Sequence, residues 1–134
     1  MVKKREFFNS IKNAENLSNL VLSRLINLKV STLSEYLEYE LPSITFLNLQ
    51  GYSKSFPQSL LGNLKGIEKF TGLKTLKVNY TSANLDISAI KNCPTLTDVT
   101  STYANIKNLS GIEELTNLQN LTLNAKIKKE LSWV

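Results

Sequence analysis

Few side chains in this sequence could carry out chemistry. The chain has 134 residues and no histidine, which removes the residue most often used as a general base and as a metal ligand. The one cysteine, Cys93, would act as a nucleophile only if a neighbouring base lowered the pKa of its thiol. Its place in the sequence argues against that role, because four similar stretches of the chain hold an apolar residue at the equivalent position. These residues are Ala14, Leu41, Phe70 and Leu115. We therefore expect Cys93 to lie in the core.

The eleven acidic residues show no catalytic pairing. Glu113 and Glu114 precede a predicted strand, and Asp98 is the acidic residue expected on a strand with its side chain directed away from the core. Hydrolysis by two carboxylates needs both within a few ångströms of the substrate bond, and a hard metal ion needs clustered oxygen ligands. The glycines match neither G-x-x-x-x-G-K nor G-x-G-x-x-G, and Gly66 and Gly111 are expected in equivalent turns. The sequence therefore predicts no catalytic residue, no metal and no cofactor, and we expect a protein that is not an enzyme.

An internal repeat determines where the remaining side chains lie. Two stretches, I-E-K-F-T-G-L-K-T-L-K-V from Ile67 and I-E-E-L-T-N-L-Q-N-L-T-L from Ile112, carry apolar residues at the same places. A third copy begins at Ile90, a weaker one begins at Ile11, and residues 41–49 show the end of the pattern only. Each copy ends in an alternation of apolar and polar residues, which is typical of a β-strand. The anchor residues, which are 27, 29, 23 and 22 residues apart, are Leu17, Ile44, Leu73, Leu96 and Leu118.

The pattern L-x-x-L-x-L at these spacings resembles the leucine-rich repeats of short bacterial proteins of the internalin type, over nearly the whole chain. The resemblance implies an α/β fold in one domain, residues 1–134. This domain would be a right-handed leucine-rich-repeat solenoid of about five repeats, with a parallel concave β-sheet and a helical or 3₁₀ convex side. Residues 1–12 are expected to cap the N-terminal end, residues 13–127 to form the repeats, and residues 128–134 to cap the C-terminal end. Alternatively, the last residues form an apolar tip that contacts a partner.

Several positions depart from a regular repeat. Ser101 replaces an inward-facing strand leucine and predicts a weak place in the core, whereas Leu121 is expected to be fully buried. The longer second and third repeats have room for true helices, at residues 33–41 and 57–70. Beyond the strands, Leu85, Ile106 and Ile127 occupy equivalent places. Asn84 and Asn105 lie beside the position at which the family often places an asparagine, so a shifted ladder of asparagines is an alternative there.

Parallel pairing of the predicted strands would align their outward side chains in rows. The rows are Asn19, Phe46, Thr75, Asp98 and Asn120; Val21, Asn48, Lys77, Thr100 and Thr122; and Ser23, Gln50, Asn79, Thr102 and Asn124. Most of these residues are amides and hydroxyls, with Phe46 as the large apolar group. Three tyrosines follow strands, and they either form an aromatic rim that binds protein or pack over the turns. The predicted partner-binding residues are Phe46, Asn48, Gln50, Tyr52, Lys74, Thr75, Lys77, Asn79, Tyr80, Asp98, Thr100, Thr102, Tyr103, Asn120, Thr122 and Asn124.

Two functional hypotheses follow. Leucine-rich repeats present a rigid curved sheet to other proteins, so the resemblance implies a non-catalytic protein-binding module, which is either a small adaptor or a stoichiometric inhibitor of its partner. The net charge of +5 supports an alternative in which basic residues contact nucleic acid or a ribonucleoprotein. The sheet face is polar and nearly uncharged, which favours the protein partner.

The remaining properties follow from composition. No apolar run is long enough to cross a membrane, so we expect no membrane partner. The single cysteine and the initial methionine favour the cytoplasm. A composition rich in Asn, Lys and Ile looks bacterial or phage-encoded. The oligomeric state stays open, since an exposed sheet edge could pair with a second copy.

Overall fold

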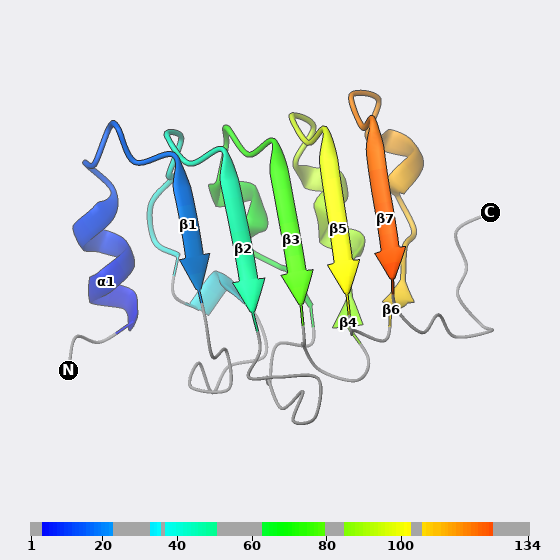
Figure 1. Ribbon diagram of the computed structural model, residues 1–134. Coiled ribbons are helices and arrows are strands. Elements are labelled where there is room, and N and C mark those ends of the chain that lie inside the picture. The colour runs from blue at the N-terminus through cyan, green and yellow to red at the C-terminus, as the bar shows by residue number, and fades with distance from the viewer. Residues whose placement is uncertain are drawn as a thin grey trace.

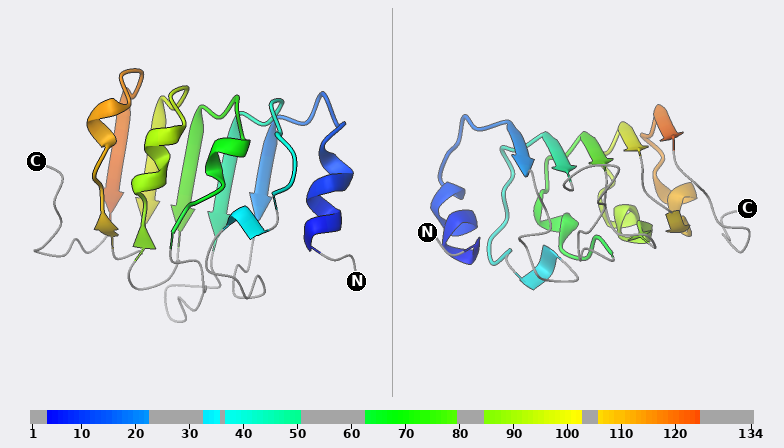
Figure 2. Two further views of the ribbon diagram at one scale, coloured as in Figure 1. Left: turned by 180° about the vertical axis from the view of Figure 1, so that it is seen from behind. Right: turned by 60° about the horizontal axis from the view of Figure 1, so that its bottom comes forward.

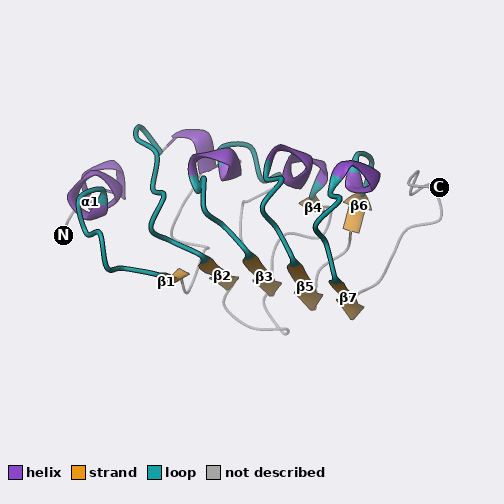
Figure 3. Ribbon diagram, turned by 90° about the horizontal axis from the view of Figure 1, so that it is seen from above, coloured by secondary structure: helices purple, strands orange, loops and turns teal. Residues whose placement is uncertain are grey.

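The computed structural model describes residues 4–22, 33–35, 37–50, 63–79, 85–102 and 106–124, and these form two layers (Figure 1). One layer is a five-stranded parallel sheet, and the other contains the helices and a small two-stranded sheet. The helices all lie on the same side of the larger sheet, as Figures 2 and 3 show.

The strands of the larger sheet, in spatial order, are β1 (Asn19–Leu22), β2 (Phe46–Gln50), β3 (Thr75–Asn79), β5 (Asp98–Thr102) and β7 (Asn120–Asn124). The elements of the other layer are α1 (Lys4–Ile11), η2 (Leu33–Glu35), η3 (Ile67–Lys69), β4 (Leu85–Asp86), η4 (Ser88–Asn92), β6 (Ile106–Asn108) and η5 (Ile112–Glu114).

The register of the larger sheet confirms the predicted rows. Phe46 pairs with Thr75, Thr75 with Asp98, and Asp98 with Asn120. Equivalent residues of successive sequence copies therefore lie side by side in the sheet, as the spacing of the anchor residues predicted. Of the row members, Ser23 lies outside the described residues.

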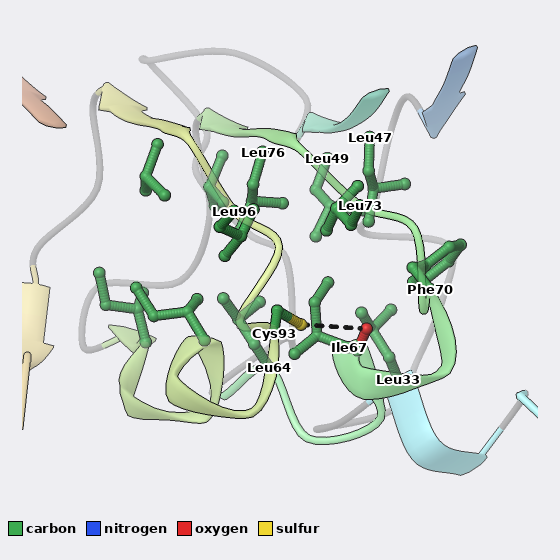
Figure 4. Packing of buried hydrophobic residues seen from close by; sticks show 14 of the residues in the cluster. Leu33, Leu47, Leu49, Leu64, Ile67, Phe70, Leu73, Leu76, Cys93 and Leu96 are labelled. Atoms are coloured by element: carbon green, nitrogen blue, oxygen red, sulfur yellow. Dashed lines mark hydrogen bonds between the residues drawn. The ribbon is translucent and has the colours of Figure 1, made fainter. Parts of the chain in front are cut away.

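Burial of alternate side chains holds each strand in this register. On β2 the inward leucines Leu47 and Leu49 are fully buried, while the residues between them are half-buried on the opposite face. The anchor Leu73 and the strand residue Leu76 are buried in the same cluster, which fills the space between the two layers (Figure 4). A shift of one residue would turn these leucines toward solvent.

A ladder of backbone hydrogen bonds fixes the starts of β2, β3, β5 and β7. The amides of Thr45 and Phe46 both donate to the carbonyl oxygen of Ser18, at 2.8 and 3.0 Å. The same two-to-one arrangement recurs at each following strand, where the accepting carbonyls belong to Thr45, Lys74 and Thr97. Because each acceptor lies one strand earlier in the sheet, the ladder aligns successive strand starts.

A second ladder, which the sequence analysis missed, organises the other layer. The side-chain Oδ1 atoms of Asn63, Asp86 and Asn108 each accept a hydrogen bond from the backbone amide two residues later, at 2.9 to 3.0 Å. Such Asx turns position the chain before η3, η4 and η5. The three residues are also aligned in space, since Asn63 forms a β-bridge with Asp86, which pairs with Asn108. The predicted equivalence of Leu85 and Ile106 is confirmed by their pairing in the β4–β6 sheet.

The prediction of a helix over residues 33–41 is wrong. Only Leu33–Glu35 forms a 3₁₀ helix, and the described residues 37–41 contain no helix. The three leucines spaced by four residues are all buried, but the backbone amides near them pair with the next copy: Ser34 donates to Lys65 and Leu41 donates to Lys69, at 2.9 and 2.8 Å. These two amides therefore bond to the neighbouring copy and not to carbonyls within an α-helix.

The helix predicted over residues 57–70 is also not observed within its described part. Residues 57–62 lie outside the described ranges, and the rest forms only the 3₁₀ helix Ile67–Lys69. Gly66 has φ +99°, a left-handed conformation that an α-helix cannot pass through. Gly111 has φ +90° at the equivalent place before η5, in agreement with the predicted turns.

The helix α1 lies at the β1 end of the sheet, where the sequence predicted an N-terminal cap (Figure 1). Phe8 on this helix is 3% exposed and belongs to the core cluster. Two further contacts join this end of the chain to the segment after η2: Asn9 Nδ2 donates to Glu38 Oε2 at 2.9 Å, and Lys12 Nζ lies 3.7 Å from the centre of the Tyr39 ring. Helix α1 is thus attached by both apolar and polar contacts.

The opposite end of the sheet corrects one prediction. Leu121 was expected to be fully buried, but it is 39% exposed. β7 pairs with β5 on one side, and among the described residues no strand pairs with its other side. The predicted C-terminal cap, residues 128–134, lies outside the described ranges.

Ser101 occupies the inward leucine position that the sequence analysis identified. Its side chain is 1% exposed, and its hydroxyl has no hydrogen-bond partner within the described part of the chain. A buried hydroxyl without a partner costs free energy, so this site weakens the core.

Among the described helices, none is long and apolar enough to cross a membrane.

Candidate functional site

The candidate site is the outward face of the larger sheet, opposite the helical layer. None of the described helices lies against it (Figure 3). Because the strands are parallel and in register, this face presents aligned rows of side chains, most of them half-buried by their neighbours. The sheet positions of the predicted site residues are therefore as expected for Phe46, Asn48, Gln50, Thr75, Lys77, Asn79, Asp98, Thr100, Thr102, Asn120, Thr122 and Asn124.

An apolar patch lies at the β1–β2 end of this face. Phe46 on β2 is half-buried, and Val21 on β1, which pairs with Asn48 in the next row, is 51% exposed. Lys77 on β3 places its Nζ 5.7 Å from the centre of the Phe46 ring, within the range of a cation–π contact. The sequence analysis placed Val21 in its row but did not include it among the binding residues, because one valine among amides gives no signal by itself.

The centre of the face is a network of polar side chains. Asn79 Nδ2 on β3 donates to Asn48 Oδ1 on β2 at 3.4 Å, and the Thr102 hydroxyl on β5 donates to Asn79 Oδ1. These bonds join three adjacent strands and orient their side chains. A face held in this way is already ordered before a partner arrives, which lowers the entropic cost of binding.

Asp98, the acidic residue on this face, is held by its neighbours. Its Oδ1 accepts a hydrogen bond from Asn120 Nδ2 on β7, and its Oδ2 accepts one from the Thr97 hydroxyl at 2.9 Å. Both carboxylate oxygens therefore have a partner within the sheet. Asp98 accordingly fixes Asn120 beside it and contributes to the order of the face.

A shallow groove borders the face at the starts of β5 and β7. Its volume is about 410 Å³, and Lys74 is the predicted site residue that lines it. Five of the other lining residues carry a hydroxyl or an amide group, namely Thr95, Thr97, Thr116, Asn117 and Gln119, and the remaining one is Leu118. The sequence analysis missed this groove, since these residues precede the strands and belong to different copies of the repeat.

The tyrosine rim lies outside the described residues. Tyr52, Tyr80 and Tyr103 are the residues concerned. Both readings of these rings, as a binding rim or as packing over the turns, therefore stay predictions.

Cys93 lies in the core, as predicted. It is 3% exposed, and its Sγ donates to the carbonyl oxygen of Ile67 at 3.5 Å (Figure 4). Burial, together with the smaller effect of the nearby charge of Glu68, raises the pKa of the thiol from 9.0 to about 12. Three of the equivalent positions, Leu41, Phe70 and Leu115, are buried as well, whereas Ala14 is exposed.

Within the described ranges, no three Cys, Asp or Glu side chains form a group that could hold a metal ion.

Comparison with known proteins adds no family to this picture. No protein-family model matches the chain, and a comparison with curated proteins likewise gave no match.

Proposed function

We propose that the chain is a short leucine-rich-repeat solenoid whose outward sheet face binds a protein partner without catalysis, as an adaptor or as a stoichiometric inhibitor. The repeat assignment is supported by the matching of sequence spacing to strand register, and by a 3₁₀ helix in the other layer before each of β3, β5 and β7. Such a stack gives a protein of this size a broad, stiff surface.

The observation that carries the binding proposal is the outward face itself. It combines an apolar patch at Phe46 and Val21 with a pre-ordered polar network around Asn79. Protein interfaces favour an aromatic anchor surrounded by polar groups that can pair with the partner. The face therefore suits a partner that inserts an apolar side chain beside Phe46 and forms hydrogen bonds across β3 and β5.

The experiment is a capture of binding proteins from a bacterial lysate with the tagged chain, followed by mass spectrometry. The capture is run with and without nuclease and at low and physiological salt. A protein recovered in stoichiometric amount under all four conditions is then purified, and its dissociation constant is measured against variants of the chain. Inhibition of an enzymatic activity of that protein would separate an inhibitor from an adaptor.

Matched variants test whether the partner binds the outward sheet face. Phe46→Ala is expected to raise the dissociation constant at least tenfold, about the loss typical of an aromatic anchor. Lys77→Glu should also weaken binding, whereas Lys91→Glu carries the same charge change on an exposed residue of η4, in the other layer, and should have no effect. If Lys91→Glu weakens binding as much as Lys77→Glu, the outward face is not the site.

The capture also tests the nucleic-acid hypothesis. Lys74 and Lys77 are its candidates on or beside the face, and Asp98 lies on the strand next to Lys77. Phosphate binding would fall steeply with salt and would be lost on nuclease treatment. Recovery that collapses under either condition, together with loss in Lys74→Glu and Lys77→Glu, would replace the protein-binding proposal.

A further inference from the structure

The two edges of the larger sheet differ. At one edge of the sheet, helix α1 lies at the same end of the molecule as β1 (Figure 1). The inward Leu20 of β1 is 8% exposed. At the other edge, β7 pairs only with β5 among the described strands, and its inward Leu121 is 39% exposed. Among the described residues, the outer side of β7 therefore has backbone groups without a strand partner, and its leucine is partly exposed.

The sequence of β7 lacks the features that usually protect an edge strand. Proteins commonly block such edges with lysine, other charges, proline or a bulge. β7 reads Asn-Leu-Thr-Leu-Asn and has none of these residues, whereas the inner strands β3 and β5 contain Lys77 and Asp98. The charged residues thus lie on the central strands, and the edge strand is neutral.

The β7 sequence is also a palindrome centred on Thr122. In an antiparallel pair of two β7 strands with Thr122 opposite Thr122, residue 121 lies opposite residue 123 and residue 120 opposite residue 124. Every residue then faces its own type, and the leucines of both copies fall on the inner face. This match of every residue with its own type arises when β7 pairs with a second copy of itself, and it is not expected for a strand of a different protein.

We propose that two copies of this chain form a symmetric dimer through antiparallel pairing of their β7 strands, centred on Thr122. The two-fold axis passes through the sheet at Thr122, and the two five-stranded sheets join into one continuous sheet with both outward faces on the same side. Leu121 of each copy packs against Leu123 of the other, which covers its exposed surface. This proposal does not depend on the proposed function, although it would double the face available to a partner.

The mass of the purified full-length chain in solution is the first test, measured by sedimentation over a wide range of concentrations. The wild-type chain should show a monomer–dimer equilibrium. Thr122→Lys places two like charges opposite one another at the axis and should raise the dimer dissociation constant at least tenfold. Thr100→Lys is the matched control, because Thr100 pairs with Thr122 in the same outward row but lies on the central strand β5. A monomeric wild-type chain, or equal effects of the two substitutions, would overturn the proposal.

Disulfide formation tests the symmetry and does not require a destabilising change. In the proposed pair the two copies of residue 122 are direct neighbours, so Thr122→Cys should oxidise to a covalent dimer. The two copies of residue 120 would be about 14 Å apart at roughly 3.4 Å per residue, so Asn120→Cys should not. The wild-type chain, whose Cys93 is buried, provides the background. Crosslinking of Asn120→Cys without crosslinking of Thr122→Cys would exclude this register.

Discussion

Leu121 on β7 lies beside Val99 on β5 in the parallel register, yet the exposed fraction of its side chain is 39%, compared with 2% for Val99. The two residues occupy the same inward row. Val99 has a paired strand on both sides, whereas Leu121 has one on a single side among the described residues. Equivalent positions in a repeat therefore contribute unequally to stability.

This difference predicts unequal costs of truncation. Leu76→Ala, in the same row at a fully buried position, should lower the free energy of unfolding by about 2–5 kcal/mol. Leu121→Ala should cost about 1 kcal/mol, because much of its side chain is already in contact with water. Urea denaturation in dilute solution, where self-association is least, measures both values. Equal losses would mean that Leu121 is buried in solution.

Ser101 offers a stabilising substitution. Its buried hydroxyl has no partner within the described part of the chain, so Ser101→Ala removes an unsatisfied polar group without adding volume. The free energy of unfolding should rise by about 1 kcal/mol. Thr100→Ala, next to it on the outward face, should change stability by less than about 0.5 kcal/mol. A lower urea midpoint for Ser101→Ala would show that the hydroxyl is hydrogen-bonded in solution.

The buried thiol of Cys93 predicts a loss of stability at alkaline pH. Its pKa is raised by burial from 9.0 in the unfolded chain to about 12 in the folded one, so the unfolded chain loses the thiol proton first. The contribution of the protonated thiol is therefore complete below pH 9.0 and is lost as the pH rises toward about 12. The measured quantity is the difference in unfolding free energy between the wild type and Cys93→Ala, which removes the contributions that the two chains share.

The same burial predicts slow alkylation. At neutral pH the folded chain should react with iodoacetamide at least about 100-fold more slowly than the urea-unfolded chain, because reaction requires local opening and a thiolate. Equal rates in the two states would place Cys93 at the surface.

Two glycines with the same conformation should differ in their tolerance of alanine. Both Gly66 and Gly111 have positive φ, which costs about 1–2 kcal/mol for a residue with a Cβ atom. A Cβ on Gly66 would lie 2.6 Å from the backbone nitrogen of Ser34, whereas a Cβ on Gly111 would lie 2.6 Å from the flexible Lys91 Cδ. Gly66→Ala should therefore lower the thermal unfolding midpoint clearly more than Gly111→Ala. The reverse order would show that the segment containing Ser34 can move away.

Local periodicity determined what the sequence could predict. Alternating apolar residues such as Leu76 and Val78 can be buried together only if every copy of the pattern enters the sheet at the same level, so the strand register followed from the spacing of the anchors. The core location of Cys93 followed for the same reason, since it occupies an apolar place in the pattern. The Asx-turn ladder could have been predicted too: Asn63 and Asn108 both begin the pattern N-L-x-G-I-E.

The tertiary structure decided the features that depend on neighbouring copies. The leucines of residues 33–41 have helical spacing, but the amides of Ser34 and Leu41 bond to carbonyls about 30 residues later, a choice that no local pattern specifies. Likewise, Val99 and Leu121 have the same place in the repeat, and only their positions in the sheet make one buried and the other exposed. Local pattern thus determined which side of each strand is apolar. Contacts between distant segments decided how each backbone bond was satisfied and where the core ends, because both depend on what lies beside a residue in space.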